Sequence, residues 1–175
     1  MIIWINGPYG VGKSTLAEEL QRRIEDSFLF DAEKVGNAVR DNMPQRFFRE
    51  TFEEFPAWHE TCYQLLKELD AMDVGCVIVP MTLIMPESEA AILQKLRRDH
   101  VDIVHVMLYS NYETIRDRIL LRGEEENCWC MRQIARCMNA QRDYPCDIRL
   151  ESVGKSPSLL ADEIIDELKT RGIFR

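Results

Sequence analysis

The sequence predicts an α/β fold, a three-layer sandwich in which a five-stranded parallel sheet carries helices on both faces. Short apolar runs alternate along the chain with segments of helical periodicity. Such alternation is typical of parallel sheets that helices cover on both sides. The 175 residues fit one domain, and no repeat, low-complexity tract or Pro/Gly-rich linker divides them. We therefore expect a single domain over residues 1–175.

Five apolar runs are the expected strands. They occupy residues 2–5, 27–30, 76–79, 103–108 and 148–150. Ligands of parallel sheets bind at the carboxyl ends of the strands. The polar motifs of this chain follow these runs, so we expect them to gather at that edge.

Segments with a helical spacing of apolar residues separate the strands. In the first, 14–24, Leu16, Leu20 and Ile24 form one stripe, and Pro86 lies near the start of another, 86–98. The remaining segments are 112–121, 131–141 and 157–169. A long, mainly helical stretch covers 33–72. It is too long for a simple crossover, so we expect a substrate cap at about 32–72.

Acidic residues number 30 and Lys plus Arg 22, which gives a formal net charge of −8. This balance argues against non-specific nucleic-acid binding and against a polybasic membrane anchor. No apolar run approaches the roughly 20 residues of a transmembrane segment, and the start of the chain lacks the basic region of a signal peptide. The six cysteines form no C-x-x-C pair, so zinc-site spacing is missing. We expect a cytoplasmic protein, monomeric or homodimeric, with reduced thiols.

A phosphate-binding loop follows the first strand. The motif G-x-x-x-x-G-K-[ST] is matched by Gly7, Pro8, Tyr9, Gly10, Val11, Gly12, Lys13 and Ser14. The glycines let backbone N–H groups face an anion, and the helix that follows adds its positive N-terminal end. Lys13 can reach the β- and γ-phosphates, Ser14 can offer its hydroxyl to Mg²⁺, and Thr15 lies beside the α-phosphate. The motif lies between a strand and a helix, as it must, so we predict nucleotide binding in a P-loop NTPase fold.

The P-loop does not name a reaction. The chain lacks the D-x-x-G and N-K-x-D motifs of GTPases. The strand at 77–79 runs into Pro80 and Thr82 without the acid that usually closes it in motor and AAA-type ATPases, and the chain is short for those machines. The small-kinase branch remains: a compact P-loop domain, similar to nucleoside monophosphate kinases, with a helical substrate cap and an arginine lid.

Asp31 ends the second expected strand and can face the P-loop. A carboxylate there can accept the proton of a substrate hydroxyl that attacks the γ-phosphate, or hold Mg²⁺ through water. The alternative is that Asp31 caps the helix beginning near Glu33, itself a weaker candidate because acids are common in a first helical turn. Two turns further on, Arg40 can clamp an anionic or amide-bearing substrate, unless it is a solvated helix arginine.

Aromatic residues concentrate between residues 47 and 63. They can line a pocket for a ring-bearing or lipophilic substrate. Helical spacing indicates that most of them belong to the core instead. Phe55 and Trp58, which flank Pro56 at an expected helix break, are the best pocket candidates.

Arginines flank the polar segment 123–129. Arg118 and Arg122 share one helix face, and Arg132 and Arg136 share another. Two such helices joined by a mobile loop can form a lid, at about 118–136, that closes on the phosphoryl group and excludes water. We assign Arg118 and Arg122 to the phosphates and Arg132 and Arg136 to the substrate. The alternative is that the arginines pair in solvent with the acids at 124–126.

A glycine-containing loop follows the fifth strand. Gly154, Lys155 and Ser156 can wrap a purine ring at a strand's carboxyl end. The alternative is an ordinary strand–helix turn with Ser156 as N-cap and Pro157 at the first helical position. The two interpretations are compatible, because a capped strand–helix turn can also contact the base.

Several segments resemble the tunicamycin-resistance family of P-loop proteins. They are 2–7, the P-loop, 31–36, Val39-Arg40, Phe55-Pro56-x-Trp58, Val79-Pro80-Met81-Thr82 and Gln133-Ile134-x-Arg136-Cys137. The resemblance covers nearly the whole chain and implies a fold similar to shikimate, gluconate and nucleoside monophosphate kinases. It also implies ATP on residues 7–15, the substrate beside Asp31 and Arg40, Arg118 and Arg122 in the lid, and a role in resistance to tunicamycin, a nucleoside antibiotic with a fatty-acyl tail.

The leading hypothesis is therefore an ATP- and Mg²⁺-dependent phosphotransferase acting on a small hydroxyl-bearing molecule, with a nucleoside-like antibiotic as the candidate substrate. Asp31 would be the base, Lys13 and the lid arginines would stabilise charge, and Ser14 would bind the metal. One alternative is an ATP-dependent protein that sequesters the drug without chemistry. Another is a nucleoside monophosphate or metabolite kinase, against which the missing D-G-x-P-R motif speaks.

Overall fold

The computed structural model describes residues 1–173, and their strands form one parallel sheet in the order β2-β3-β1-β4-β5. The strands are β1 (Ile2–Asn6), β2 (Ser27–Leu29), β3 (Cys76–Pro80), β4 (Ile103–Tyr109) and β5 (Ile148–Glu151). All five lie within one residue of the expected runs, which confirms the α/β P-loop NTPase fold predicted from the sequence.

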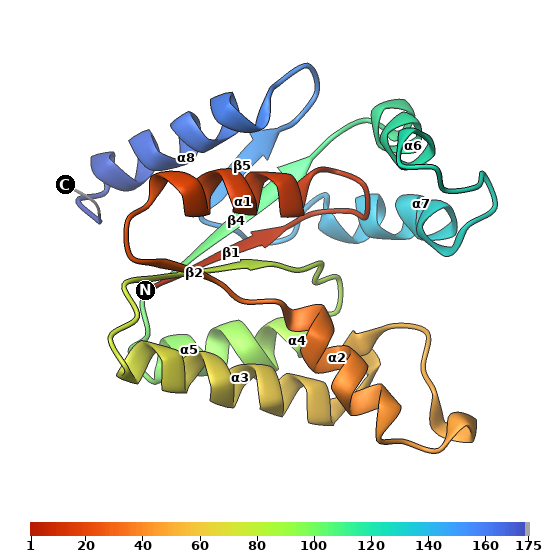
Figure 1. Ribbon diagram of the computed structural model, residues 1–175, viewed down its shortest axis with the longest axis horizontal. Coiled ribbons are helices and arrows are strands. Elements are labelled where there is room, and N and C mark those ends of the chain that lie inside the picture. Colours follow the sequence, from red (N-terminus) through yellow and green to blue (C-terminus); the bar gives the residue numbers. More distant parts are fainter. Residues whose placement is uncertain (174–175) are drawn as a thin grey trace.

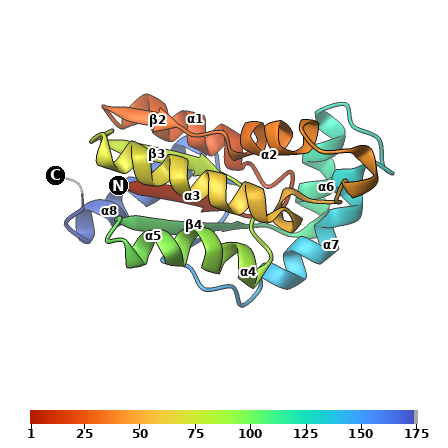
Figure 2. The same cartoon turned by 90° about the horizontal axis from the view of Figure 1, so that it is seen from below.

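Helices cover both faces of the sheet (Figure 1). On one face lie α1 (Lys13–Arg23) and α8 (Pro157–Thr170). The other face carries α3 (Pro56–Ala71) and a continuous helical run made of α4 (Pro86–Glu89), the π-helical turn η3 (Ala90–Gln94) and α5 (Lys95–Arg98). Figure 2, in which the molecule is seen from below, shows α3 beside this run in front of the sheet.

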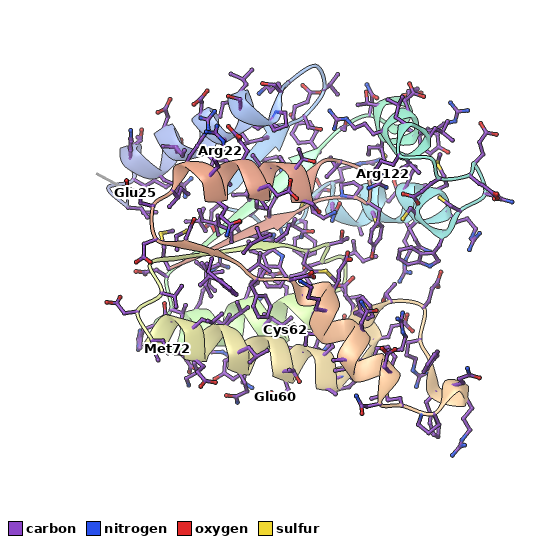
Figure 3. The ribbon with its side chains drawn as sticks, in the orientation of Figure 1. Arg22, Glu25, Glu60, Cys62, Met72 and Arg122 are labelled. Carbon is purple, nitrogen blue, oxygen red and sulfur yellow. The ribbon has the colours of Figure 1, made fainter. Side chains whose placement is uncertain are left out.

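The alternation of side chains along β1 feeds two cores. Ile2 and Trp4 pack with α3, whereas Ile3 and Ile5 pack with α1 and α8, and all four are fully buried. Side chains on α3 divide in the same way: in Figure 3 Cys62 points toward the sheet and Glu60 points away from it. Central strands buried on both faces explain why their sequences are continuously apolar.

The cap is less helical than expected. Helix α2 (Ala32–Asp41) ends well before α3, and two short 3₁₀ turns, η1 (Gln45–Phe47) and η2 (Phe52–Glu54), connect them. Pro44 and Pro56 break the helical path, with Pro56 in the first turn of α3. Gly36 of α2 lets the Phe52 ring approach, since a Cβ there would lie 2.4 Å from it.

The remaining helices, α6 (Tyr112–Leu121) and α7 (Trp129–Gln141), lie at the end of the sheet where the strands have their carboxyl ends (Figure 1). The P-loop lies at this same end. Within residues 1–173 none of the helices has the length and apolarity to cross a membrane.

Candidate active site

The P-loop leaves β1 at Asn6, which is fully buried and holds the loop in place. Its Oδ1 accepts hydrogen bonds from the Gly7 and Leu83 backbone N–H groups, each at 2.8 Å. Thr82 Oγ1 donates to the Gly7 carbonyl at 2.9 Å. The residues that directly follow the carboxyl end of β3 include no acid. They support the P-loop instead through backbone and hydroxyl contacts.

Left-handed backbone at Gly10 (φ 83°) and Gly12 (φ 109°) curls the loop around the start of α1. These angles favour glycine because it has no Cβ. The hydroxyl-bearing Ser14 and Thr15 are exposed in the first turn of α1. This arrangement forms the anion-binding cradle that the motif predicts.

Lys13 spans the cradle. Its Nζ donates to the carbonyl oxygens of Gly7 at 3.0 Å and Pro8 at 2.9 Å. Burial lowers the pKa of Lys13 to about 8, because the charged form loses water. A polyphosphate placed in the cradle would favour the charged form again.

A cavity of about 560 Å³, here the P-loop cavity, opens beside this loop. It brings together segments that are distant in the sequence: residues 9–16, Glu33, Arg118 and Arg122 of the α6 end, and Lys155 of the β5–α8 loop. Figure 3 shows Arg122 between the end of α6 and the P-loop. The sequence predicted this convergence of loop, lid and base-loop residues.

Two of the lid arginines line the P-loop cavity, and both have partners. Arg118 donates to the Val11 carbonyl at 2.6 Å and to Ser152 Oγ and O at 2.9 and 2.8 Å. Arg122 pairs with Glu124 at 2.6 Å, in line with the alternative that lid arginines pair with the neighbouring acids.

The other two lid arginines lie elsewhere. Arg132 donates to the Asn127 carbonyl, and Arg136 lies 3.9 Å from Glu50; neither borders the cavities at the P-loop. In this structure they do not line the expected substrate site; both are exposed on α7, and the partner of Arg136, Glu50, lines the cap cavity.

In the β5–α8 loop, Lys155 borders the P-loop cavity and pairs with Glu163 at 2.7 Å. Gly154 has left-handed backbone (φ 67°), and Ser156 caps α8 by accepting from the Leu159 N–H at 3.2 Å. The loop is thus an N-capped strand–helix turn, with Lys155 alone of the three lining the cavity.

A second cavity of about 410 Å³, here the cap cavity, adjoins the first. The two share Tyr9, Glu33 and Cys130 in their linings. The cap cavity also has Arg40 and Arg49 in its wall. Phosphate loop and cap therefore meet at one place, as a group-transfer site requires.

Asp31 is the N-cap of α2. Its Oδ1 accepts from the Glu33 and Lys34 backbone N–H groups, both at 3.1 Å. Its side chain lies outside both cavity linings, whereas Glu33 lines both. Sequence reasoning ranked Glu33 below Asp31; the signal that could have raised it is that residue 33 is the first acid inside a helix aimed at the P-loop.

Aromatic and cationic side chains form the remaining walls of the cap cavity. Arg40 bonds to Asn37 Oδ1 at 2.7 Å and lies 5.7 Å from the Phe52 ring centroid. Phe55 lines the cavity as expected. The pocket role expected for Trp58 is wrong: Trp58 is fully buried in the core, and its Nε1 donates to the Ala32 carbonyl at 2.9 Å.

Trp129 and Arg49 were missed by sequence reasoning. Trp129 opens α7, lines the cap cavity and stands edge-on to the Tyr9 ring, with centroids 4.7 Å apart. Its place at the end of the polar lid segment was the available signal. Arg49 lies in a segment without periodicity, so nothing in the sequence pointed to it.

Comparison with known proteins agrees with this geometry. The sequence model of a family described as an AAA domain matches residues 3–131, so the chain belongs to that family. The sequence speaks against AAA-type ATPases because β3 has no closing acid. The match shows that this missing acid does not exclude the chain from a family described as an AAA domain. No curated protein matches the chain significantly.

Solved structures show the same fold. The tunicamycin resistance protein of Deinococcus radiodurans is 24% identical, with a TM-score of 0.79 over 95% of this chain and 94% of that one. Shikimate kinase of Aquifex aeolicus is 19% identical (TM-score 0.65, all of both chains). APS kinase of Mycobacterium tuberculosis in complex with AMPPNP and APS is 17% identical (TM-score 0.66, 96% of each chain). The chain thus has a P-loop kinase-like fold.

Proposed function

We propose that this protein is an ATP- and Mg²⁺-dependent phosphotransferase that acts on a small hydroxyl-bearing molecule. The observation that carries the proposal is the junction of the two cavities at Tyr9, Glu33 and Cys130. One cavity carries the phosphate cradle and the other carries arginines and aromatic walls. A phosphoryl donor and an acceptor would meet where the cavities join.

The residues present fit a nucleotide and a metal. The P-loop supplies backbone N–H groups and Lys13, and Ser14 supplies an exposed hydroxyl. Residues 1–173 hold no cluster of three His, Cys, Asp or Glu side chains for a metal. This suits Mg²⁺ held by Ser14, phosphates and water, with Asp31 as an outer partner. When bound, Mg²⁺ would neutralise phosphate charge.

We assign the proton-accepting role to Glu33, which lines both cavities, and an outer, positioning role to the N-cap Asp31. Oδ1 of Asp31 is engaged with two backbone N–H groups, which suits a fixed outer ligand. Glu33 faces both cavities and can accept the proton of a hydroxyl placed in the cap cavity. Lys13 and Arg122 stabilise charge on the transferred group, because phosphoryl transfer depends on positioning and electrostatics.

The cap cavity defines the acceptor. Arg40 and Arg49 favour a substrate with an anionic or amide group, and Tyr9, Phe55 and Trp129 favour a ring. A nucleoside-like compound satisfies both conditions. Likeness to the Deinococcus radiodurans tunicamycin resistance protein makes tunicamycin the first compound to test.

The test is mass spectrometry of tunicamycin, and of a panel of hydroxylated nucleosides and sugars, after incubation with the protein, ATP and Mg²⁺. We expect the mass of one phosphate to be added to at least one compound. Glu33→Gln should abolish the addition, Asp31→Asn should slow it, and Glu113→Gln, an exposed acid in the first turn of α6, should leave it unchanged.

The alternative is that the protein holds tunicamycin without chemistry. The unmodified drug would then co-purify with the protein, and Glu33→Gln would leave ATP affinity and drug binding intact. If no compound in the panel is phosphorylated and none binds, the proposed acceptor class is contradicted.

A further inference from the structure

A third cavity lies on the other side of α7, between α6, α7 and the ends of β4 and β5. Its volume is about 510 Å³. Pro8, Tyr109, Ser110, Met138 and Gln141 are among its lining residues. Its wall shares no residue with the P-loop and cap cavities, so this cavity, here the α6–α7 cavity, is a separate compartment behind the P-loop.

Two buried polar atoms in its wall lack a partner among residues 1–173. They are Ser110 Oγ and Gln141 Oε1, on side chains that are 7% and 4% exposed. The Gln141 amide is oriented by its nitrogen, which donates to Asn6 Oδ1 at 2.9 Å and to the Leu83 carbonyl at 3.4 Å. This leaves an acceptor oxygen free, and a buried acceptor without a donor is costly.

The rest of the wall combines apolar surface with positive charge. Met138 and Pro8 are apolar, and the residues Tyr109 and Tyr112 are 40% and 44% exposed. Arg142 is exposed at the end of α7, where its guanidinium makes one long hydrogen bond, to Asn139 Oδ1 at 3.4 Å. A guanidinium so weakly engaged can bind an anionic group.

From this juxtaposition we infer a second ligand site that takes a ring-bearing anion with a hydrogen-bond donor on or beside the ring. The ring would lie on Met138 and the tyrosines, the donor would satisfy Gln141 Oε1, and the anionic group would meet Arg142. The Ser110 hydroxyl can donate or accept a hydrogen bond, so it can pair with either a donor or an acceptor on the ligand. The site stands on its own lining and does not rest on the proposed phosphotransfer.

The wall gives the site a physical link to the P-loop. Pro8 belongs to both, and Gln141 bonds to Asn6, which holds the Gly7 N–H. A ligand that engages Gln141 therefore acts on the group that positions the P-loop. We infer that occupancy changes nucleotide affinity, and that nucleotide changes the affinity of this ligand by the same factor.

The probe is 8-anilinonaphthalene-1-sulfonate, which has rings, an N–H donor and a sulfonate and fluoresces when it is removed from water. It is titrated into the whole chain with saturating AMPPNP and Mg²⁺, so that the P-loop cavity is occupied. We expect one saturable site. Ala135→Trp, which places an indole in the cavity wall, should abolish binding, and Ala140→Trp, an exposed α7 position outside that wall, should not.

The charge is tested separately. Arg142→Gln should weaken binding about tenfold, the effect of one charge-assisted hydrogen bond. Arg98→Gln, an exposed arginine on α5, is the matched control. Arg142 is exposed, so this variant serves even if Ala135→Trp does not fold.

Absence of saturable binding, equal binding by all four variants, or complete displacement of the probe by AMPPNP would overturn the inference. None of these results depends on phosphoryl transfer, and failure of the transfer assay would leave this site untouched. An AMPPNP dissociation constant that is the same with and without the probe would overturn the link to the P-loop.

Discussion

The guanidinium of Arg118 donates a hydrogen bond to the carbonyl oxygen of Val11 at 2.6 Å, across 107 residues of sequence. The same side chain bonds twice to Ser152, so that α6, the P-loop and the β5–α8 loop share one arginine. Arg118 thus ties α6 to the P-loop and to the residue that follows β5. These bonds hold the three segments together around the cradle.

Replacing Arg118 should weaken nucleotide binding. Arg118→Ala removes three hydrogen bonds from a charged donor, so we expect the AMPPNP dissociation constant to rise at least tenfold and the free energy of unfolding to fall by about 2 kcal/mol. Calorimetry and thermal unfolding measure the two effects. Arg116→Ala, which removes a half-exposed arginine paired with Asp117 and Glu126 at the surface, should change neither. Unchanged nucleotide affinity in Arg118→Ala would show that these three hydrogen bonds are not needed for nucleotide binding.

Nucleotide affinity should fall as the pH rises above about 8. The pKa of Lys13 in the free protein is lowered by burial from its ordinary value of 10.5 to about 8, so Lys13 loses its proton above that pH. Phosphates bind the protonated form, so binding must then take up a proton. We expect the AMPPNP dissociation constant to rise between pH 8 and 9.5, by up to tenfold per pH unit.

The control is Lys13→Arg, which remains charged over this range. It should bind more weakly at pH 7.5 but with little dependence on pH. Calorimetry in buffers of different ionisation enthalpy should detect proton uptake by the unmutated protein at pH 8.5. A flat profile for the unmutated protein would show that Lys13 keeps its ordinary pKa.

Arg122 should matter for turnover more than for binding. It lines the P-loop cavity but is paired with Glu124 at 2.6 Å, so it must change partner to reach a transferred phosphoryl group. We expect Arg122→Ala to lower kcat about a hundredfold, as loss of one charge-stabilising donor does, and to change the AMPPNP dissociation constant less than threefold. Steady-state ATP turnover gives the first quantity.

Glu124→Gln is the companion variant. It releases Arg122 and should leave kcat equal to or above that of the unmutated protein. A hundredfold loss in Glu124→Gln would instead assign the effect to the integrity of the ion pair.

Trp58 should contribute to stability without affecting the acceptor. Trp58→Phe removes a buried hydrogen bond to Ala32 and part of a fully buried ring, so the free energy of unfolding should fall by about 2 kcal/mol. Chemical denaturation measures this. As a control, Phe48→Leu at an exposed position should lower the free energy of unfolding by less than about 1 kcal/mol. If Trp58→Phe raises the KM for the acceptor tenfold without a loss of stability, Trp58 contributes to acceptor binding and this prediction is wrong.

The sheet and the P-loop were predictable because their signals are local. Each strand is a short apolar run, since both faces are buried, and the loop needs glycines at fixed spacing. The convergence of Arg118, Arg122 and Lys155 on the P-loop cavity followed from the rule that strand ends meet at one edge.

The cap could not be predicted in the same detail. Its irregular segment between α2 and α3 is fixed by long-range contacts, such as the Glu53 carboxylate that accepts from the Ile84 and Met85 N–H groups at 2.9 Å. Helical spacing cannot say which aromatic side chain faces a cavity, so Trp58 was expected in the pocket and Trp129 was missed. Glu33 and Asp31 are two residues apart, and only the direction of α2 separates a cap from a cavity-facing carboxylate.

The most direct test of the account is calorimetric titration of AMPPNP with Mg²⁺ into the unmutated protein and into Lys13→Ala. The account predicts one nucleotide per chain for the unmutated protein and at least a hundredfold loss of affinity for the variant, because Lys13 is the charged side chain inside the cradle. Equal affinity in both proteins, or no binding to either, would contradict the assignment of residues 7–15 as the phosphate site.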